Sequence, residues 1–143
     1  MVIKKHGSAH WSGGLKDGKG SVSTESGALK EQPYGFNIRF GGEPGTNPEE
    51  LIGAALASCY SMALSKTVQD AGFTAESLET KAVVSLDQQD GGFAITGIEL
   101  TLNAKVSGAD EAKVRDMAEQ TKVACPVSKA LKAVPIGLTV NVG

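Results

Sequence analysis

The amino-acid sequence predicts an α+β fold, in a single domain that covers residues 1–143. Three observations predict it: strand-like segments lie on both sides of a long stretch with helical periodicity, two of them flank a hairpin turn, and a second helical stretch follows that hairpin. This order of strands and helices favours antiparallel sheets. Apolar residues make up 41% of the chain, so a core can form without disulfide bonds.

Residues 1–46 are rich in glycine, and the first element expected in them is a hairpin. The segment "GLKDGKG" contains Asp17 and Gly18, a pair that is typical of hairpin turns. Further on, "FNIRF" alternates apolar and polar residues. This alternation predicts a half-buried strand over residues 36–40, with Arg39 on its polar side.

A long helix is predicted from Pro48 to about Ala71. Proline suits the first helical position, Asn47 is preferred over Thr46 as the N-cap, and Gly72 suits the end of the helix. Apolar side chains recur along it at steps of three and four residues: Leu51, Ile52, Ala55, Leu56, Cys59, Met62 and Ala63. Small residues on its other sides predict a crowded interior or an interface.

The rest of the chain predicts a hairpin, two helices and a final strand. "LETKAVVSLD" and "FAITGIELTLNAKV" are strand-like and are joined by the turn "QQDGG". A helix capped by Asp110 should follow and should bury one face: Val114, Met117, Ala118 and Thr121. Pro126 can open a short helix with Cys125 directly before it, and "IGLTVNV" closes the chain as a strand.

Composition argues against several classes of protein. Fourteen basic and sixteen acidic side chains give a net charge of −2 without a long run of either sign, which disfavours a nucleic-acid surface. The start, "MVIKKHGSAHW", has no apolar segment typical of a secretory signal, and no stretch approaches the length of an apolar membrane span. We therefore expect no membrane association and a cytoplasmic location, where thiols are usually reduced.

The two cysteines, Cys59 and Cys125, have neither the CxxC spacing nor the spacing of a zinc site. Because His6 and His10 are the only histidines, we expect no metal. Three interpretations of the cysteines remain open: two buried structural thiols, a structural disulfide, or a redox pair in which Cys59 attacks an oxidant and Cys125 resolves the product. A helix N-terminus beside Cys125 would favour its thiolate.

Two charged residues are candidates to assist a reactive thiol. Arg39 is one of only two arginines, and its planar fork could hold a carboxylate and a thiolate together. Glu49 could orient that arginine, although a glutamate in a first helical turn is also favoured by the helix dipole. Ten residues, or about 15 Å of helix, separate Glu49 from Cys59. If both serve one site, they come from two copies of the chain or from a sharply bent helix.

Several segments together resemble the osmotically inducible protein C (OsmC) family, a sister of the organic hydroperoxide resistance proteins: "VSTESG", "QPYGFNIRF", "GTNPEELIGAALASCYSMAL", "AGF", "VSLD", "GFAIT" and "CPVSKALKA". The resemblance covers nearly the whole chain. It implies thiol-dependent reduction of organic hydroperoxides, and of hydrogen peroxide less well, in oxidative or osmotic stress defence. By this resemblance Cys59 is the peroxidatic cysteine, Cys125 is the resolving cysteine that forms a disulfide with it, and Arg39 and Glu49 are the charged pair beside the sulfur.

The resemblance also implies an intertwined homodimer, in which antiparallel sheets wrap two central helices and the active sites are shared at the interface. It implies no bound cofactor and an external dithiol reductant, of lipoyl type to judge from the sister branch. That branch carries its arginine in an N-terminal loop, whereas the corresponding "GLKDGKG" has only lysines, which leaves Arg39 as the candidate.

Five apolar residues are predicted to line a pocket for the alkyl tail of a peroxide, with core packing as the alternative for each: Phe36, Phe40, Leu51, Ile52 and Leu56. Three other functions compete with the peroxidase. The first is a non-enzymatic, stress-induced dimer that binds an apolar ligand. The second is a thiol-disulfide oxidoreductase, which the absence of CxxC disfavours. The third is a hydrolase that pairs Cys59 with His6 or His10.

Overall fold

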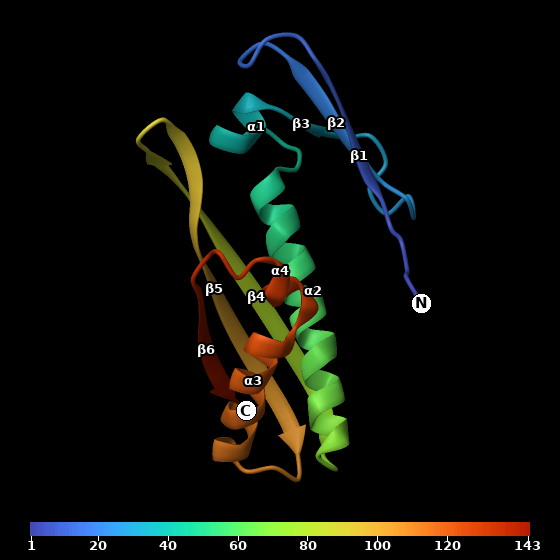
Figure 1. Cartoon of the computed structure of the whole chain (residues 1–143), viewed down its shortest axis with the longest axis vertical. Coiled ribbons are helices and arrows are strands. Elements are labelled where there is room, and N and C mark those ends of the chain that lie inside the picture. Colours follow the sequence, from blue (N-terminus) through green and yellow to red (C-terminus); the bar gives the residue numbers. More distant parts are fainter. The chain divides into compact units, whose positions relative to one another are not determined.

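The structure, a computed structural model, describes all of residues 1–143. It consists of two compact units, an N-terminal unit (Met1–Pro48) and a C-terminal unit (Glu49–Gly143), whose elements are labelled in Figure 1. Ten helices and strands follow one another along the chain. The single domain expected from the sequence is thus built of two parts that each have their own internal packing.

The N-terminal unit contains a three-stranded antiparallel sheet in the order β1-β2-β3 (Figure 1). Its strands are β1 (Gly7–Ser12), β2 (Lys19–Thr24) and β3 (Gln32–Tyr34). The predicted hairpin is confirmed, because β1 and β2 pair across the turn that holds Asp17 and Gly18. The Gly18 N–H donates to the carbonyl oxygen of Gly14 at 2.9 Å and closes this turn.

Residues 36–40, which were predicted to form a strand, form a short helix, α1 (Phe36–Phe40). The Arg39 N–H donates to the carbonyl of Gly35 at 2.8 Å, which is the hydrogen bond of a helical turn. In a helix, residues four apart share a face, so Phe36 and Phe40 still lie side by side, with ring centroids 5.0 Å apart. The strand prediction was wrong because five residues are too few to separate a period of two from this spacing.

The C-terminal unit is built on a second three-stranded sheet, in the order β4-β5-β6. Its strands are β4 (Thr74–Gln89), β5 (Gly92–Ser107) and β6 (Ile136–Val142). The predicted hairpin of β4 and β5 is confirmed as an antiparallel pair. The last strand departs from the expected antiparallel pairing, because β6 runs parallel to β5. Two helices between these strands carry the chain back along β5, so β6 starts beside Ile98 and runs in the same direction as β5.

Three helices accompany this sheet: α2 (Pro48–Asp70), α3 (Glu111–Ala124) and α4 (Pro126–Ala130). Gly72 ends α2 with a φ of 87°, and the N–H groups of Gly72 and Phe73 donate to the carbonyls of Gln69 and Val68 at 3.0 and 3.1 Å. These two bonds form a Schellman motif, so the predicted end of the helix is confirmed. The predicted cap of α3 is also confirmed, because the Asp110 side chain accepts the N–H of Lys113 at 2.8 Å.

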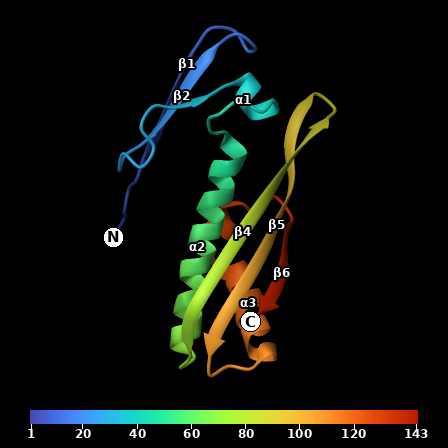
Figure 2. The same ribbon diagram turned by 180° about the vertical axis from the view of Figure 1, so that it is seen from behind.

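The core of the unit lies between the helices and one face of the sheet (Figure 2). One face of α2 contributes side chains four residues apart, and they pack against alternate residues of β5 and one face of α3: Leu56, Tyr60, Leu64 and Val68; Ile98, Leu100, Leu102 and Ala104; Val114, Met117 and Ala118. The Tyr60 hydroxyl donates to the Ala118 carbonyl at 2.9 Å. This bond satisfies the one polar atom of a fully buried ring and fixes α2 against α3.

The long helix α2 has the length and hydropathy of a membrane-crossing helix. Its buried face packs within the core, and the core helix of a soluble protein passes the same test of length and composition. The opposite side carries a stripe of exposed and mostly small residues, the α2 stripe: Ala54, Ala55, Ser58 and Met62. Met62 is 74% exposed, so a large apolar side chain of this helix has no cover in the single chain.

Candidate active site

The structure brings the two cysteines together. Cys59 lies in the middle of α2, Cys125 lies between α3 and α4, and their sulfur atoms are 3.1 Å apart. Both are free thiols, and a disulfide would require the sulfurs to approach by about 1 Å. Cys125 is 0% exposed, whereas Cys59 is partly exposed and packs against the edge of the core. A direct contact between the sulfurs of the only two cysteines in the chain favours a thiol pair over two separate core residues.

The position of Cys125 follows from the proline after it. Pro126 has no N–H and cannot continue α3, so the chain turns at Cys125 and starts α4. The Cys125 N–H still donates to the Thr121 carbonyl at 2.9 Å, and its carbonyl accepts the Lys129 N–H at 3.0 Å. Cys125 is therefore held by both helices and faces α2 from the core.

The surroundings of the two sulfurs shift their pKa values in opposite directions. Burial raises the pKa of Cys59, the Cys125 side chain raises it further, and the Val127 N–H opposes these effects only in part. Burial also acts to raise the pKa of Cys125, but the Ser128 N–H, the Cys59 side chain, the Ser128 hydroxyl and the Val127 N–H together hold it below the usual range. Within the C-terminal unit, a negative charge is therefore better placed on Cys125 than on Cys59.

Tyr60, next to Cys59 in sequence, has a structural place in this region. Burial raises the pKa of its phenol, and the charges of Glu119 and Cys125 raise it further. The ring stays neutral at physiological pH and keeps its hydrogen bond to the Ala118 carbonyl. Tyr60 thus anchors the turn of α2 that carries Cys59.

The charged candidates lie in different units. Arg39 is in α1 of the N-terminal unit, with its guanidinium over the Phe40 ring at 5.4 Å from the centroid. Glu49 is in the first turn of α2, in the C-terminal unit. Because α2 runs without interruption from Pro48 to Asp70, Glu49 and Cys59 of one copy are about 15 Å apart along the helix. The assistance of Arg39 and Glu49 to the thiol stays a prediction.

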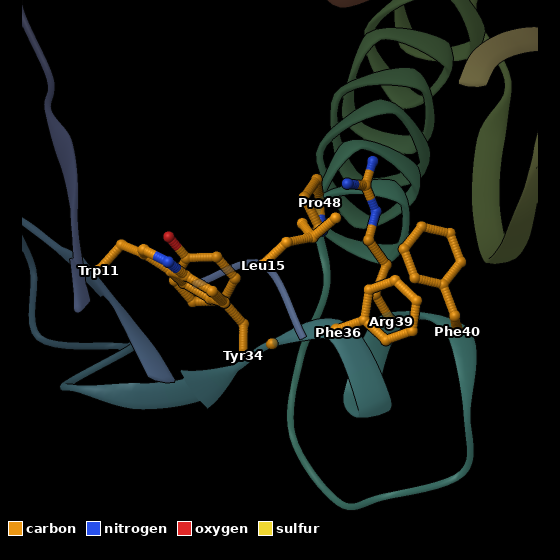
Figure 3. A pocket seen from close by; sticks show the side chains of 8 residues that line it. Trp11, Leu15, Tyr34, Phe36, Arg39, Phe40 and Pro48 are labelled. Atoms are coloured by element: carbon orange, nitrogen blue, oxygen red, sulfur yellow. The ribbon is translucent and has the colours of Figure 1, made fainter. Parts of the chain in front are cut away.

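The N-terminal unit contains a pocket of about 240 Å³ that Arg39 shares with aromatic rings (Figure 3). Its lining is Trp11, Leu15, Tyr34, Gly35, Phe36, Arg39, Phe40 and Pro48. The Trp11 and Tyr34 rings contact each other, with centroids 5.5 Å apart. Gly20 pairs with both residues in the sheet, and a Cβ there would overlap both rings. Glycine at this position is what allows the aromatic wall to form.

Two of the five predicted pocket residues, Phe36 and Phe40, line this pocket. The other three belong to α2: Leu56 is 0% exposed in the core, Ile52 packs against the core, and Leu51 is half-buried. The pocket also includes Trp11, Leu15 and Tyr34, which were not predicted from the sequence. The position of the only tryptophan beside a predicted hairpin turn was the available signal.

The remaining alternatives can be compared with the same geometry. No group of three or more His, Cys, Asp or Glu side chains is arranged to hold a metal ion. Both histidines of the chain lie in the N-terminal unit, whereas both thiols lie in the C-terminal unit. The C-terminal unit therefore contains no imidazole that could serve Cys59 as a base.

Comparison with known proteins agrees with this site. The family model for OsmC-like proteins matches residues 41–139, which include both cysteines. The chain is 58% identical over 133 residues to peroxiredoxin OsmC of Escherichia coli, with 93% of each chain covered. It is 33% identical over 115 residues to the organic hydroperoxide resistance protein OhrB of Bacillus subtilis, with 79% of this chain and 82% of OhrB covered.

Solved structures show the same fold. The crystal structure of OhrB of Bacillus subtilis superimposes with a TM-score of 0.73 at 26% identity and covers 96% of this chain and 98% of its own. An organic hydroperoxide resistance protein from Elizabethkingia anophelis gives a TM-score of 0.76 at 26% identity, with coverage of 100% and 99%. With its thiol pair, its α+β fold and these similarities over most of its length, the chain belongs to the OsmC family.

Proposed function

We propose that this protein is a thiol-dependent peroxidase that reduces organic hydroperoxides, and hydrogen peroxide less well. The observation that carries the proposal is the 3.1 Å contact between the free sulfurs of Cys59 and Cys125. The names of its relatives, a peroxiredoxin and organic hydroperoxide resistance proteins, support the same chemistry.

The cycle needs two thiols and one external dithiol. The Cys59 thiolate attacks the terminal oxygen of the hydroperoxide, the O–O bond breaks, and the alkoxide takes a proton and leaves as an alcohol. Cys59 is then a sulfenic acid. The Cys125 sulfur attacks the Cys59 sulfur, water leaves, and a disulfide forms. A dithiol reduces that disulfide and is itself oxidised to a disulfide.

In this proposal the Arg39 guanidinium binds both the Cys59 sulfur and the peroxide. Glu49 holds the Arg39 side chain in place. An ordinary thiol with a pKa of about 8.5 is a few per cent ionised at pH 7, so full ionisation gains about 30-fold. Enzymes accelerate reactions by about 10⁶-fold or more, so alignment of the peroxide and stabilisation of the leaving alkoxide must supply the larger part. Burial raises the pKa of Cys59, so the need for a cation at this sulfur is greater than for a free thiol.

A homodimer is the proposed assembly. Glu49 cannot reach Cys59 of its own copy along a continuous α2, and the α2 stripe leaves Met62 74% exposed. Small residues along the stripe let a second helix approach closely, and a second copy would cover Met62. In this assembly each active site combines residues of two copies.

The aromatic pocket of the N-terminal unit is proposed to hold the organic part of the substrate. Its rings offer apolar surface, and Arg39 at its wall offers a donor for the peroxide oxygens (Figure 3). The proposed reductant is a dithiol, of lipoyl type, because a dithiol can close into a ring after the first exchange. A cytoplasmic location is proposed with it, since the cycle depends on a supply of reduced thiols.

The decisive experiment adds one equivalent of cumene hydroperoxide to the reduced protein and counts free thiols, with Cys59→Ser and Cys125→Ser in parallel. We expect both thiols to disappear as one intramolecular disulfide, and Cys59→Ser to leave Cys125 unreacted. The Cys125→Ser protein should consume one equivalent and stop as a sulfenic acid. Survival of both thiols in the wild type would rule out the peroxidase and leave an apolar-ligand-binding dimer as the better function.

A further inference from the structure

The buried hydroxyl of Ser128 is not explained by the fold. Ser128 is 5% exposed, and its Oγ has no hydrogen-bond partner in the protein with free thiols. By contrast, the buried Thr121 hydroxyl donates to the Met117 carbonyl at 2.8 Å. Leaving a buried hydroxyl without a partner is unfavourable, and such a group in a native structure calls for a functional explanation.

Ser128 lies beside the resolving sulfur. Cys125 is the N-cap residue of α4 and Ser128 is the third residue after it, and in a helix the side chains at these two positions face each other. The bond from the Lys129 N–H to the Cys125 carbonyl closes this first turn. Burial acts to raise the pKa of Cys125, but Ser128, through its N–H and its hydroxyl, is among the groups that lower it. The Ser128 hydroxyl is thus placed to stabilise the charged form of this sulfur.

We propose that Ser128 is a positioning residue for the reductive half of the cycle, whose hydroxyl donates a hydrogen bond to the Cys125 sulfur as that sulfur leaves the disulfide as a thiolate. The inference rests on the proposed function, because the Cys59–Cys125 disulfide is the oxidised state of that cycle. It gives the buried hydroxyl, which has no partner in the structure with free thiols, a partner during the reaction.

The burial of the two sulfurs gives the direction of this step. Cys125 is 0% exposed, so an external dithiol reaches the Cys59 sulfur. The reductant thiolate attacks Cys59, the S–S bond breaks, and the electron pair leaves with Cys125. The second thiol of the reductant then displaces Cys59 and closes the oxidised, cyclic reductant. Two electrons and the two thiol protons of the reductant end on the protein as two free thiols.

The size of the effect follows from leaving-group chemistry. Thiol-disulfide exchange is faster when the leaving thiol has a lower pKa. A hydrogen bond to a charged acceptor in a buried site changes such a rate by about tenfold. The bond forms only as charge develops on Cys125, so it assists reduction and leaves the attack of Cys59 on a peroxide unchanged.

The test uses disulfide made with diamide, so that it does not depend on peroxidase activity. Oxidised wild type, Ser128→Ala and Ser128→Thr are mixed with dithiothreitol, quenched with acid, and assayed for free thiols over time. We expect Ser128→Ala to be reduced about tenfold more slowly and Ser128→Thr, which keeps the donor, to recover most of the rate. Ser61→Ala is the matched control, because Ser61 already bonds to Thr80 at 2.7 Å, and its rate should equal that of the wild type.

A second measurement separates a local role from a general loss of structure. Reduced Ser128→Ala should react with cumene hydroperoxide within twofold of the wild-type rate. Equal slowing of both halves of the cycle, or reduction of Ser128→Ala at the wild-type rate, would overturn the proposal. In a further outcome the reduced wild type shows no reaction with peroxide, while the rate at which dithiothreitol reduces its diamide-made disulfide still depends on Ser128. That result would disprove the peroxidase function and support the role of Ser128.

The site of attack is read from a trapped mixed disulfide. Oxidised protein is treated with a large excess of glutathione, quenched with acid, its free thiols are blocked, and the glutathione label is located in the tryptic peptides 40–66 and 123–129, which contain Cys59 and Cys125. We expect the label on Cys59. A label on Cys125 would mean that this sulfur does not leave, and the role of Ser128 would be disproved.

Discussion

The two regions that the proposed site needs are built in different ways. The thiol pair lies on the large core of the C-terminal unit, where α2, α3 and β5 hold both cysteine backbones. The pocket with Arg39 lies in the N-terminal unit, on a five-residue helix with no buried residue. The thiols are therefore positioned by core packing, whereas Arg39 lies on a short helix without buried residues, beside aromatic rings. Substitutions in the two regions should therefore change different properties of the protein.

The largest effect is expected for Arg39→Lys, which keeps the charge and removes the planar fork. If Arg39 aligns the peroxide and stabilises the alkoxide, the rate of Cys59 oxidation should fall by about 100-fold while the fold remains intact. Stopped-flow consumption of cumene hydroperoxide measures this. Arg115→Lys is the matched control, because Arg115 is bound to Glu111 and the Val140 carbonyl on α3 and β6. An unchanged rate in Arg39→Lys would remove Arg39 from the site.

The next effect concerns assembly. Met62→Glu places a charge in the middle of the α2 stripe, and we expect it to convert the dimer to a monomer at micromolar concentration and to abolish turnover. Light scattering during gel filtration gives the mass. Val123→Glu is the control, since Val123 on α3 is 71% exposed, close to the value for Met62. A Met62→Glu protein that elutes as a dimer would show that α2 is not the interface.

Two substitutions should distinguish the structural role of the core from the substrate-binding role of the pocket. Leu56→Ala removes a side chain that is 0% exposed, and we expect it to lower the free energy of unfolding by about 2–5 kcal/mol. Phe36→Ala opens the aromatic pocket and should cost less stability, but it should raise the KM for cumene hydroperoxide more than the KM for hydrogen peroxide. Urea unfolding and steady-state kinetics on both variants give the comparison. Equal effects on both substrates would mean that the pocket does not hold the organic group.

Elements with strong local signals could be predicted from the sequence. Asp110 as a cap, Gly72 as a helix end and Pro126 as a helix start each act within a few residues, so the pattern alone locates them. The buried face of α3 was also predicted in full, because four apolar or small side chains at helical spacing leave one way to face a core.

Features that local spacing leaves ambiguous, or that depend on distant residues, could not be predicted in this way. The five residues of α1 satisfy both a strand and a helical pattern, and their spacing alone does not show that the Arg39 and Gly41 N–H groups form helical hydrogen bonds. The direction of β6 depends on how α3 and α4 return the chain, which no local signal encodes. The contact of Cys59 with Cys125 followed from the family resemblance, whereas the only signal for the aromatic wall of Trp11 and Tyr34 was the position of the tryptophan beside a predicted hairpin turn.

The smallest effect tests whether the two regions act on one sulfur. In a Cys125→Ser protein Cys59 is the only thiol, and the double Ser variant is the reference. Burial raises the pKa of Cys59, so without Arg39 the native state keeps its proton at a pH where the unfolded chain has lost it. In an Arg39→Ala background, the stability of Cys125→Ser relative to the reference should therefore fall as pH rises through about 8.5, the pKa of an unfolded thiol.

With Arg39 present the sign should reverse. If the guanidinium reaches Cys59 in the assembled protein and brings its pKa below that of the unfolded thiol, the native state loses the proton first, and the relative stability rises with pH up to about 8.5. Urea unfolding between pH 7 and 9, at one protein concentration and under argon, measures both slopes. A falling slope in both backgrounds would mean that Arg39 does not ionise Cys59 in the resting protein, and its role would then be confined to the peroxide.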